Sequence, residues 1–135
     1  MKTFRTIAVA IAVLFAGNGL APHMAQAQQP GVKRTDLQQH DLSVPGREVV
    51  QVRVDIAPGV LAPNHSHPGE EIVYVIEGLL EYQLEGKSAV TLRAGEVLFI
   101  PAGTIHSAKN VGSANAAELA TYIVEKGKPL VTLVK

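Results

Sequence analysis

Residues 59–78 read GVLAPNHSHPGEEIVYVIEG and combine two histidines, a glutamate and an apolar run, with glycine at both ends. His65 and His67 are two positions apart, so an extended chain presents both imidazoles on the same face. Glu71 has the same parity, and an intervening Pro-Gly pair supplies a turn or kink. One strand edge is therefore expected to bring three potential ligands to a single point.

A second stretch, residues 95–110, reads GEVLFIPAGTIHSAKN and supplies a third histidine from another part of the chain. Imidazole nitrogens and carboxylate oxygens are ligands that borderline divalent metals accept. Four such ligands leave part of the coordination sphere open for water, oxygen or substrate. We therefore predict one divalent transition metal, with zinc, copper, nickel, iron and manganese all left open. The candidate ligands are His65, His67, Glu71 and His106.

The two stretches resemble the paired motifs of the cupin superfamily. The first motif runs Gly, five residues, His-x-His, three or four residues, Glu, six residues and Gly, and residues 59–78 match every fixed position. The second runs Gly, five residues, Pro-x-Gly, two residues, His, three residues and Asn, and residues 95–110 match it as well. The spacer of sixteen residues is close to that of small bacterial cupins, and the resemblance covers roughly residues 45–126.

This resemblance implies a fold, a ligand set and a chemistry. The implied fold is an all-β double-stranded β-helix, the jelly-roll barrel of cupins, and the implied metal ligands are His65, His67, Glu71 and His106. Similarity to the quercetin dioxygenase-like cupins suggests an oxidoreductase whose metal binds a substrate enolate or catecholate and directs oxygen onto it. Glu71 is then catalytic as well, because the family implies a ligand that also accepts a proton.

The remaining sequence after residue 46 is strand-like. Apolar and polar residues alternate in 50–56 and in 80–85, which is the period of a strand with one buried face. Short strands separated by glycine and proline indicate a sandwich or barrel, in agreement with a jelly roll. Further strands are expected at residues 89–92, 97–100, 105–109, 117–124 and 130–134.

The N-terminus predicts export. Lys2 and Arg5 precede an apolar stretch at residues 7–16, and a small-x-small sequence follows at residues 25–27. This order is typical of a secretory signal peptide, here residues 1–27, and the apolar stretch is short for a membrane span. We therefore expect a periplasmic or secreted protein with no membrane span after processing; retention of the segment as an anchor is the alternative.

An arm and a single domain are expected to follow the signal peptide. About 108 residues remain after processing, enough for one domain and too few for two. We expect a flexible or dimerising arm at residues 28–46, a cupin domain at residues 47–135, and a homodimer. The chain has no cysteine, which excludes disulfides and thiol catalysis. Equal numbers of basic and acidic residues do not favour nucleic acid as a partner.

Several alternatives stay open. Glu70 competes with Glu71 as a ligand, although parity and the cupin motif favour Glu71, and His40 is expected to be an ordinary surface histidine. The sequence does not separate a metal-dependent dioxygenase that acts on a small oxyanion-type substrate from a non-catalytic periplasmic protein that binds a metal or small ligand. A metal-independent sugar epimerase is least favoured, because no His-Asp pair is placed as an acid-base couple. Few aromatic residues are present, so a small substrate is favoured over a flavonoid.

Overall fold

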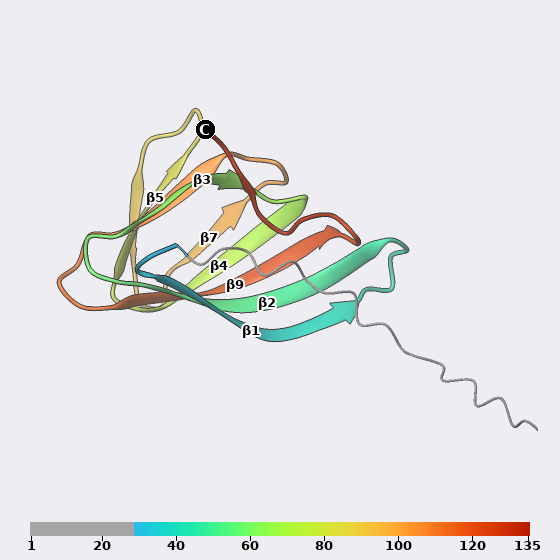
Figure 1. Cartoon of the computed structure of the whole chain (residues 1–135), viewed down its shortest axis with the longest axis horizontal. Helices are drawn as coiled ribbons and strands as arrows, with labels where there is room; N and C mark the ends of the chain where they lie inside the picture. Colours follow the sequence, from blue (N-terminus) through green and yellow to red (C-terminus); the bar gives the residue numbers. More distant parts are fainter. Residues whose placement is uncertain (1–28) are drawn as a thin grey trace, which may run out of the picture.

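The computed structural model describes residues 29–135, which form ten β-strands without a helix (Figure 1). No segment of this range is therefore a helix long and apolar enough to cross a membrane. The predicted signal peptide, residues 1–27, lies outside the described residues. The strands are β1 (Val32–Asp41), β2 (Arg47–Ile56), β3 (Leu61–Ser66), β4 (Gly69–Glu77), β5 (Leu79–Leu84), β6 (Val90–Arg93), β7 (Val97–Ile100), β8 (His106–Asn110), β9 (Ala116–Glu125) and β10 (Thr132–Leu133).

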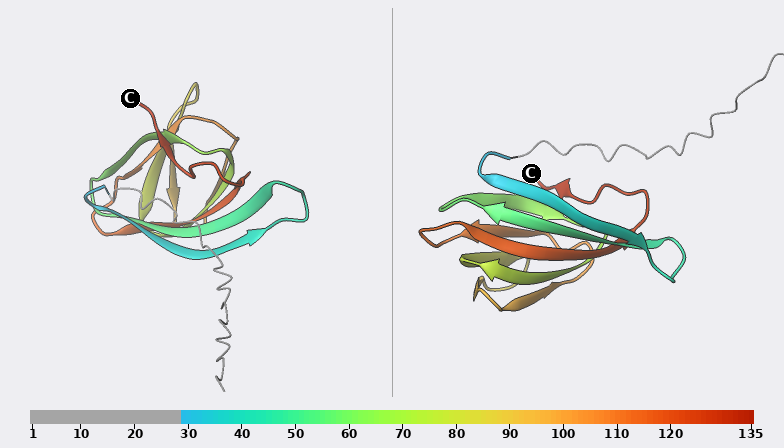
Figure 2. Two further views of the ribbon diagram at one scale, coloured as in Figure 1. Left: turned by 45° about the vertical axis from the view of Figure 1, so that its right-hand side comes forward. Right: turned by 90° about the horizontal axis from the view of Figure 1, so that it is seen from below.

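Two antiparallel sheets face each other. The first sheet has the order β1-β2-β9-β4-β7 and the second has the order β10-β3-β8-β5-β6. Figure 2 shows the first sheet as a curved layer with the second sheet lying over its concave side. This arrangement confirms the predicted all-β jelly roll.

The chain passes repeatedly from one sheet to the other between successive strands. β3 belongs to the second sheet, β4 to the first and β5 again to the second. Gly78 makes the crossing from β4 to β5 with a φ of 79°. A Cβ atom there would lie 2.6 Å from the Cα of Ala116, so both backbone conformation and space require the glycine that closes the first motif.

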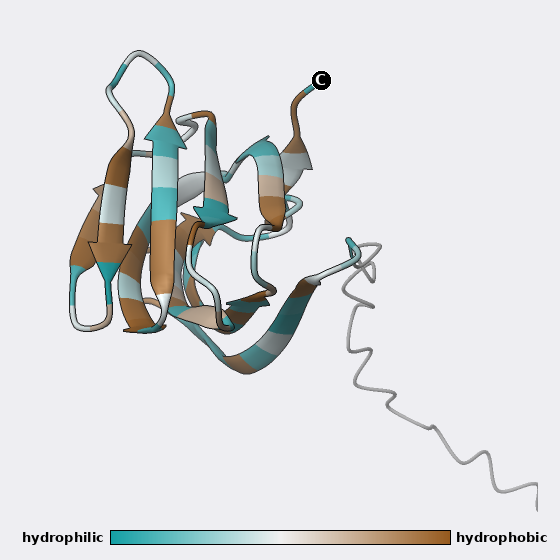
Figure 3. Cartoon of the chain, turned by 90° about the vertical axis from the view of Figure 1, so that its left-hand side faces the viewer, coloured by the Kyte–Doolittle hydropathy of each residue, from teal (hydrophilic) through white to brown (hydrophobic). Residues whose placement is uncertain are grey.

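The core fills the space between the sheets because alternate positions of each strand point inward. Bands of apolar and polar residues alternate along the strands in Figure 3, as expected for two sheets that each bury one face. Val52, Val54 and Ile56 on β2 pack into the same buried cluster as Leu80 and Tyr82 on β5.

Residues 32–41, which we placed in a flexible or dimerising arm, form β1 at the edge of the first sheet. β1 pairs with β2 from Val32 opposite Ile56 to Asp41 opposite Glu48. Most of its side chains are polar and exposed, so the strand lacks the apolar alternation that marked the others. Backbone pairing to β2, with little burial of side chains, holds this segment in the sheet.

A buried asparagine, Asn110, stabilises the turn that connects β8 to β9. Its side-chain amide donates hydrogen bonds to the carbonyl oxygens of Ile56 and Ala114, each at 2.8 Å. The side-chain oxygen of Asn110 accepts a third bond from the backbone N–H of Gly112 at 2.9 Å. Asn110 is fully buried, so these bonds satisfy backbone groups where water has little access.

Replacing Asn110 with alanine should lower the free energy of unfolding by about 2–5 kcal/mol, because three backbone groups each lose a hydrogen-bond partner. Asn115→Ala is the matched control, since the Asn115 amide bonds the half-buried carboxylate of Asp55 and the exposed carboxylate of Glu77. Urea denaturation of both variants measures the difference. Equal destabilisation by the two substitutions would contradict the role given to Asn110.

Candidate metal centre

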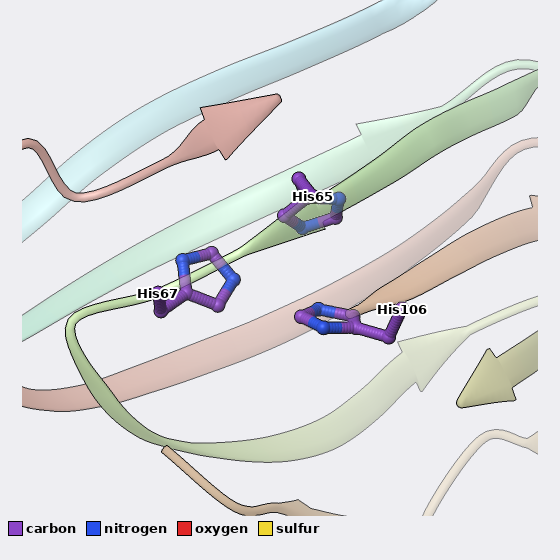
Figure 4. A group of neighbouring side chains, drawn as sticks. All are labelled: His65, His67 and His106. Carbon is purple, nitrogen blue, oxygen red and sulfur yellow. The ribbon is translucent and has the colours of Figure 1, made fainter. Parts of the chain in front are cut away.

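Three histidines meet between the two sheets. His65 near the end of β3 lies directly opposite His106 at the start of β8, so the two form a cross-strand pair. His67 follows where the chain leaves β3 for the facing sheet, and all three residues are buried. One ring nitrogen from each lies within 4.8 Å of the others. Figure 4 shows the three imidazole rings gathered around a common point.

Backbone carbonyls fix the orientation of each imidazole ring. Nδ1 of His65 donates to the carbonyl of Pro63 at 2.7 Å, and Nδ1 of His106 donates to that of Thr104 at 2.9 Å. Nδ1 of His67 donates to the carbonyl of Leu130 at 2.6 Å. A carbonyl can only accept, so these bonds place the proton of each neutral imidazole on Nδ1 and leave a lone pair on Nε2. Metal-binding histidines are held in this way.

Glu71 reaches the cluster from the facing sheet. Its Oε2 atom lies 3.1 Å from Nε2 of His67 and 3.1 Å from Nε2 of His106. We expected one strand edge to deliver His65, His67 and Glu71, but the chain crosses between the sheets after His67. The site therefore lies in the interior, with Glu71 on β4 opposite the histidines of the second sheet.

The meeting of these atoms requires a cation. Nε2 of His67 and Oε2 of Glu71 are both buried without a hydrogen-bond partner, although they lie 3.1 Å apart. Two lone pairs facing each other at this distance repel, unless a proton or a metal ion lies between them. The donor set of imidazole nitrogens and one carboxylate fits a single divalent transition metal.

The pKa shifts of His65, His106 and Glu71 also indicate that the site favours a positive charge beside Glu71. Burial, reinforced by the neighbouring His106, lowers the pKa of His65 to about 4. Burial would also lower the pKa of His106, but the hydrogen bond and charge of Glu71 outweigh it and raise that pKa. Burial would raise the pKa of Glu71, yet the ring nitrogens of His106 and His67 that face it, each able to take up a second proton, hold that pKa well below its usual range. Glu71 is therefore an ionised carboxylate.

A second set of polar side chains lies in the interior, and the sequence analysis missed it. The Tyr82 hydroxyl donates a hydrogen bond to the Glu118 carboxylate, and both residues are buried. Arg34 donates from Nη2 to the hydroxyl of Tyr122 at 2.7 Å. The sequence does contain a signal for Glu118. It lies an even number of residues from the core residue Tyr122 on the same strand, so both side chains face the interior.

Glu118 holds a proton more tightly than an ordinary glutamate. Burial and the negative charge of Glu71 raise the pKa of Glu118 to about 7, although Tyr82 and Arg34 oppose the shift. Burial and the charge of Glu118 in turn raise the pKa of Tyr82 well above its ordinary value. Tyr82 is therefore a neutral donor, and the protonation of Glu118 changes near neutral pH.

The other candidate residues lie away from the cluster. His40 is exposed on β1, as expected for a surface histidine. Glu70 is half-buried on β4 and has the opposite parity to Glu71.

The backbone N–H of Gly103 donates to the carbonyl of His67 at 3.1 Å, so the second motif supports the first through its turn as well as through His106.

Comparisons with known proteins agree with this geometry. The family described as "Cupin domain" matches residues 52–124. Germin-like protein subfamily 2 member 2 of Arabidopsis thaliana is 38% identical over 87 residues, which cover 58% of this chain and 40% of that protein. This chain thus spans about two fifths of the length of that curated relative.

Two solved structures are similar as well. Recombinant oxalate oxidase in complex with glycolate has a TM-score of 0.63 and 29% identity, over 79% of this chain and 57% of that chain. An uncharacterised protein with a double-stranded β-helix domain from Klebsiella pneumoniae has a TM-score of 0.65 and 21% identity, over 82% and 90% of the two chains. The second likeness supports the fold alone.

Each candidate ligand should be needed for tight metal binding. Loss of a residue that only supports a ligand costs roughly 10–100-fold in affinity, so a larger loss is expected when alanine replaces His65, His67, Glu71 or His106. Glu70→Ala is the matched control and should retain the metal, because Glu70 points away from the cluster. Elemental analysis after dialysis against a weak chelator measures the metal bound per chain. Full occupancy in a His67→Ala, His106→Ala double variant would rule out a single shared ion.

Glu118→Gln should stabilise the metal-free protein at pH 8 and change its stability little at pH 4. The folded protein binds the Glu118 proton more tightly than the unfolded chain, because the pKa rises from 4.5 to about 7 on folding. The free energy of unfolding therefore falls as the pH rises from 4.5 to about 7, by up to about 3 kcal/mol in total, and does not recover above pH 7. Glutamine does not ionise and still accepts the bond from Tyr82.

Chemical denaturation at the two pH values tests this expectation, with Glu85→Gln as an exposed control. A gain in stability that is the same at pH 4 and pH 8 would show that the buried charge of Glu118 is not its cause.

Proposed function

This chain belongs to the cupin domain family, and we propose that it is an exported metal-dependent oxidoreductase that oxidises a small organic oxyanion with dioxygen. The observation that carries the proposal is the buried group of three imidazoles whose Nε2 atoms face the carboxylate of Glu71. Three or four protein ligands leave coordination positions free for a substrate.

Each residue of the site has a role in this proposal. His65, His67 and His106 hold the metal, and Glu71 is the fourth ligand. When bound, a redox-active divalent metal would supply Lewis acidity toward the substrate oxyanion and a path for electrons to dioxygen. Glu71 is ionised, and the cupin resemblance implies that it also accepts the proton that the substrate releases on binding. All four side chains are buried, so water has little access to them.

The similarity to oxalate oxidase in complex with glycolate supports the choice of substrate class. Oxalate and glycolate are both small organic acids, so we propose a substrate of similar size and charge. The germin-like relative is longer than this chain, which covers 40% of it, so its full activity is not transferred.

Export and dimerisation are also part of the proposal. Export is supported by the signal-like sequence of residues 1–27, and the compartment would be the periplasm or the exterior. A homodimer is supported by the outer face of the first sheet, where exposed apolar side chains pair across two strands. These pairs are Ile72 with Phe99 and Tyr74 with Val97.

Oxygen uptake tests the enzymatic proposal. Protein purified from its native compartment should contain mainly zinc, copper or nickel, because nitrogen and oxygen donors bind these ions more tightly than manganese or iron(II). We expect at least one metal, after reloading, to support oxygen uptake that matches the loss of a small hydroxy acid, dicarboxylate, enol or diketone. The His67→Ala, His106→Ala variant serves as the inactive control.

Absence of turnover with every metal and substrate class would replace the oxidoreductase with the alternative, a periplasmic protein that binds a metal or small ligand. Predominant iron or manganese in native material would show that geometry or supply, and not ligand affinity, selects the metal.

A further inference from the structure

We propose that the segment after β9, residues 126–134, is a strap that closes the metal centre, and that a metal ion enters and leaves the site when this strap opens. The inference rests on the metal site of the proposed function, and it adds the route by which that site exchanges its ion. It does not involve oxidation, so it can be tested with zinc, which is not redox-active.

The strap passes from one sheet to the other. It begins at the end of β9 in the first sheet, where the backbone N–H of Lys126 donates to the carbonyl of Gly46 at 3.0 Å. It ends in the second sheet, where β10 pairs with β3 and the N–H of Val134 donates to the carbonyl of Asn64 at 2.9 Å. Figure 1 shows this segment in dark red as it runs from β9 back toward β3. The strap therefore connects the two layers that carry the candidate ligands.

Two contacts bring the strap onto the histidines. The carbonyl of Leu130 accepts the hydrogen bond from Nδ1 of His67 at 2.6 Å, and Leu133 lies opposite His65 in the pairing of β10 with β3. The Leu130 side chain is half-buried and packs against the apolar core. His65 is 8% exposed and His67 is 4% exposed. An ion held by these two histidines therefore meets little solvent while the strap is docked.

The strap is held less firmly than the strands that carry the ligands. β3, β4 and β8 each lie between two neighbouring strands of their sheet, whereas β10 pairs with β3 through two residues. The ion pair between Lys126 and Asp41 joins exposed side chains and adds little to docking. Local opening occurs first where little surface is buried and few hydrogen bonds must break together. The strap should therefore open while the two sheets stay intact.

Gly127 provides a hinge at the start of the strap. Its φ is 78°, and a Cβ atom there would meet nothing within 4 Å, so backbone conformation and not space favours glycine. Residues 126–129 are all exposed. A change of the backbone angles at Gly127 would move the residues that follow it away from the histidines and leave β9 paired with its neighbours.

An engineered disulfide between the strap and β3 tests this gate. Thr132 lies directly opposite Ser66, and directly opposed residues of an antiparallel pair are close enough for a disulfide. The natural chain has no cysteine, so the Thr132→Cys, Ser66→Cys variant carries the engineered pair alone. In the unlocked form of this variant the two thiols are blocked as methyl disulfides, so that they do not bind zinc. Mass spectrometry verifies both forms.

Zinc release into a chromogenic chelator is measured at chelator concentrations above which the rate no longer changes. We expect the locked form to release zinc roughly tenfold or more slowly than the unlocked form, because the local opening is blocked. The unlocked form should match the natural chain. Equal release from the locked and unlocked forms would overturn the gate and place the route elsewhere, such as at the turn that contains Gly103.

Leu130→Ala provides a second test that needs no disulfide. It removes the packing of the strap but keeps the carbonyl that orients His67. Zinc loading and zinc release should both become about tenfold faster. The affinity should stay within about twofold, because opening precedes both steps. Faster release without faster loading would show damage to the site and contradict the gate. Leu37→Ala, which removes an exposed leucine from β1, is the matched control.

Hydrogen exchange of the metal-free protein adds a readout that is independent of zinc. The N–H of Val134, which bonds Asn64, should exchange on the order of 100-fold faster than the N–H of Asn110, which bonds the carbonyl of Val60 at 3.0 Å. Equal exchange at the two positions would mean that the strap opens only when the whole domain unfolds, which would overturn the proposal.

The outcomes separate the gate from the proposed function. Slower zinc release from the locked form, without oxygen uptake by any metal form, would keep the gate and reject the oxidoreductase. Oxygen uptake together with equal zinc release from both forms would do the opposite. Failure of the natural chain to bind zinc or any other divalent metal would reject the metal centre and the gate together.

Discussion

The three hydrogen bonds from Nδ1 atoms to backbone carbonyls determine the character of this interior. They commit each neutral imidazole to one tautomer, so that its Nε2 lone pair faces the others and the carboxylate of Glu71. Electron-rich atoms brought together in a dry space are unfavourable without a cation. Folding stability and metal binding are thus coupled, because the arrangement that the sheets impose is satisfied only when positive charge is present.

The balance of charge extends beyond the cluster. Glu118 and Glu71 are both buried between the sheets, and the ionised Glu71 contributes to the raised pKa of Glu118. A divalent cation beside Glu71 would reduce this repulsion and allow Glu118 to ionise more easily. Arg34 adds positive charge on the side of Tyr122. The protonation of the interior therefore depends on whether the site holds its metal, on the metal's charge and on any bound acid.

Much of the architecture could be predicted from the sequence, and the omissions have physical reasons. The expected strand at residues 97–100 coincides with β7, and the one at 117–124 lies within β9. Alternation reveals such strands because one face of each is buried. β1 escaped detection because its side chains are mostly exposed, and only backbone pairing, which leaves no pattern in the residues, holds it in place.

Part of the candidate site could likewise be predicted from the sequence, and part could not. The spacing of the two motifs indicated His65, His67 and His106, which meet in the structure, because the motif positions imply convergence once the fold is known. Glu118 and Arg34 belong to no motif. They face the interior only through strand parity and register, and the register of β1 against β2 cannot be derived from composition.

The carbonyl that orients His67 comes from Leu130, far along the chain from the histidine itself. β10 follows at once and pairs with β3 at His65 and Ser66, so the segment after β9 lies against the strand that carries the first ligands. During synthesis, a chain that has been made only as far as β9 already contains every candidate ligand but lacks this acceptor. An ion captured at that stage would meet a His67 ring that is free to present either nitrogen. The hydrogen bond that fixes the His67 tautomer is therefore complete only when the segment that follows β9 has docked.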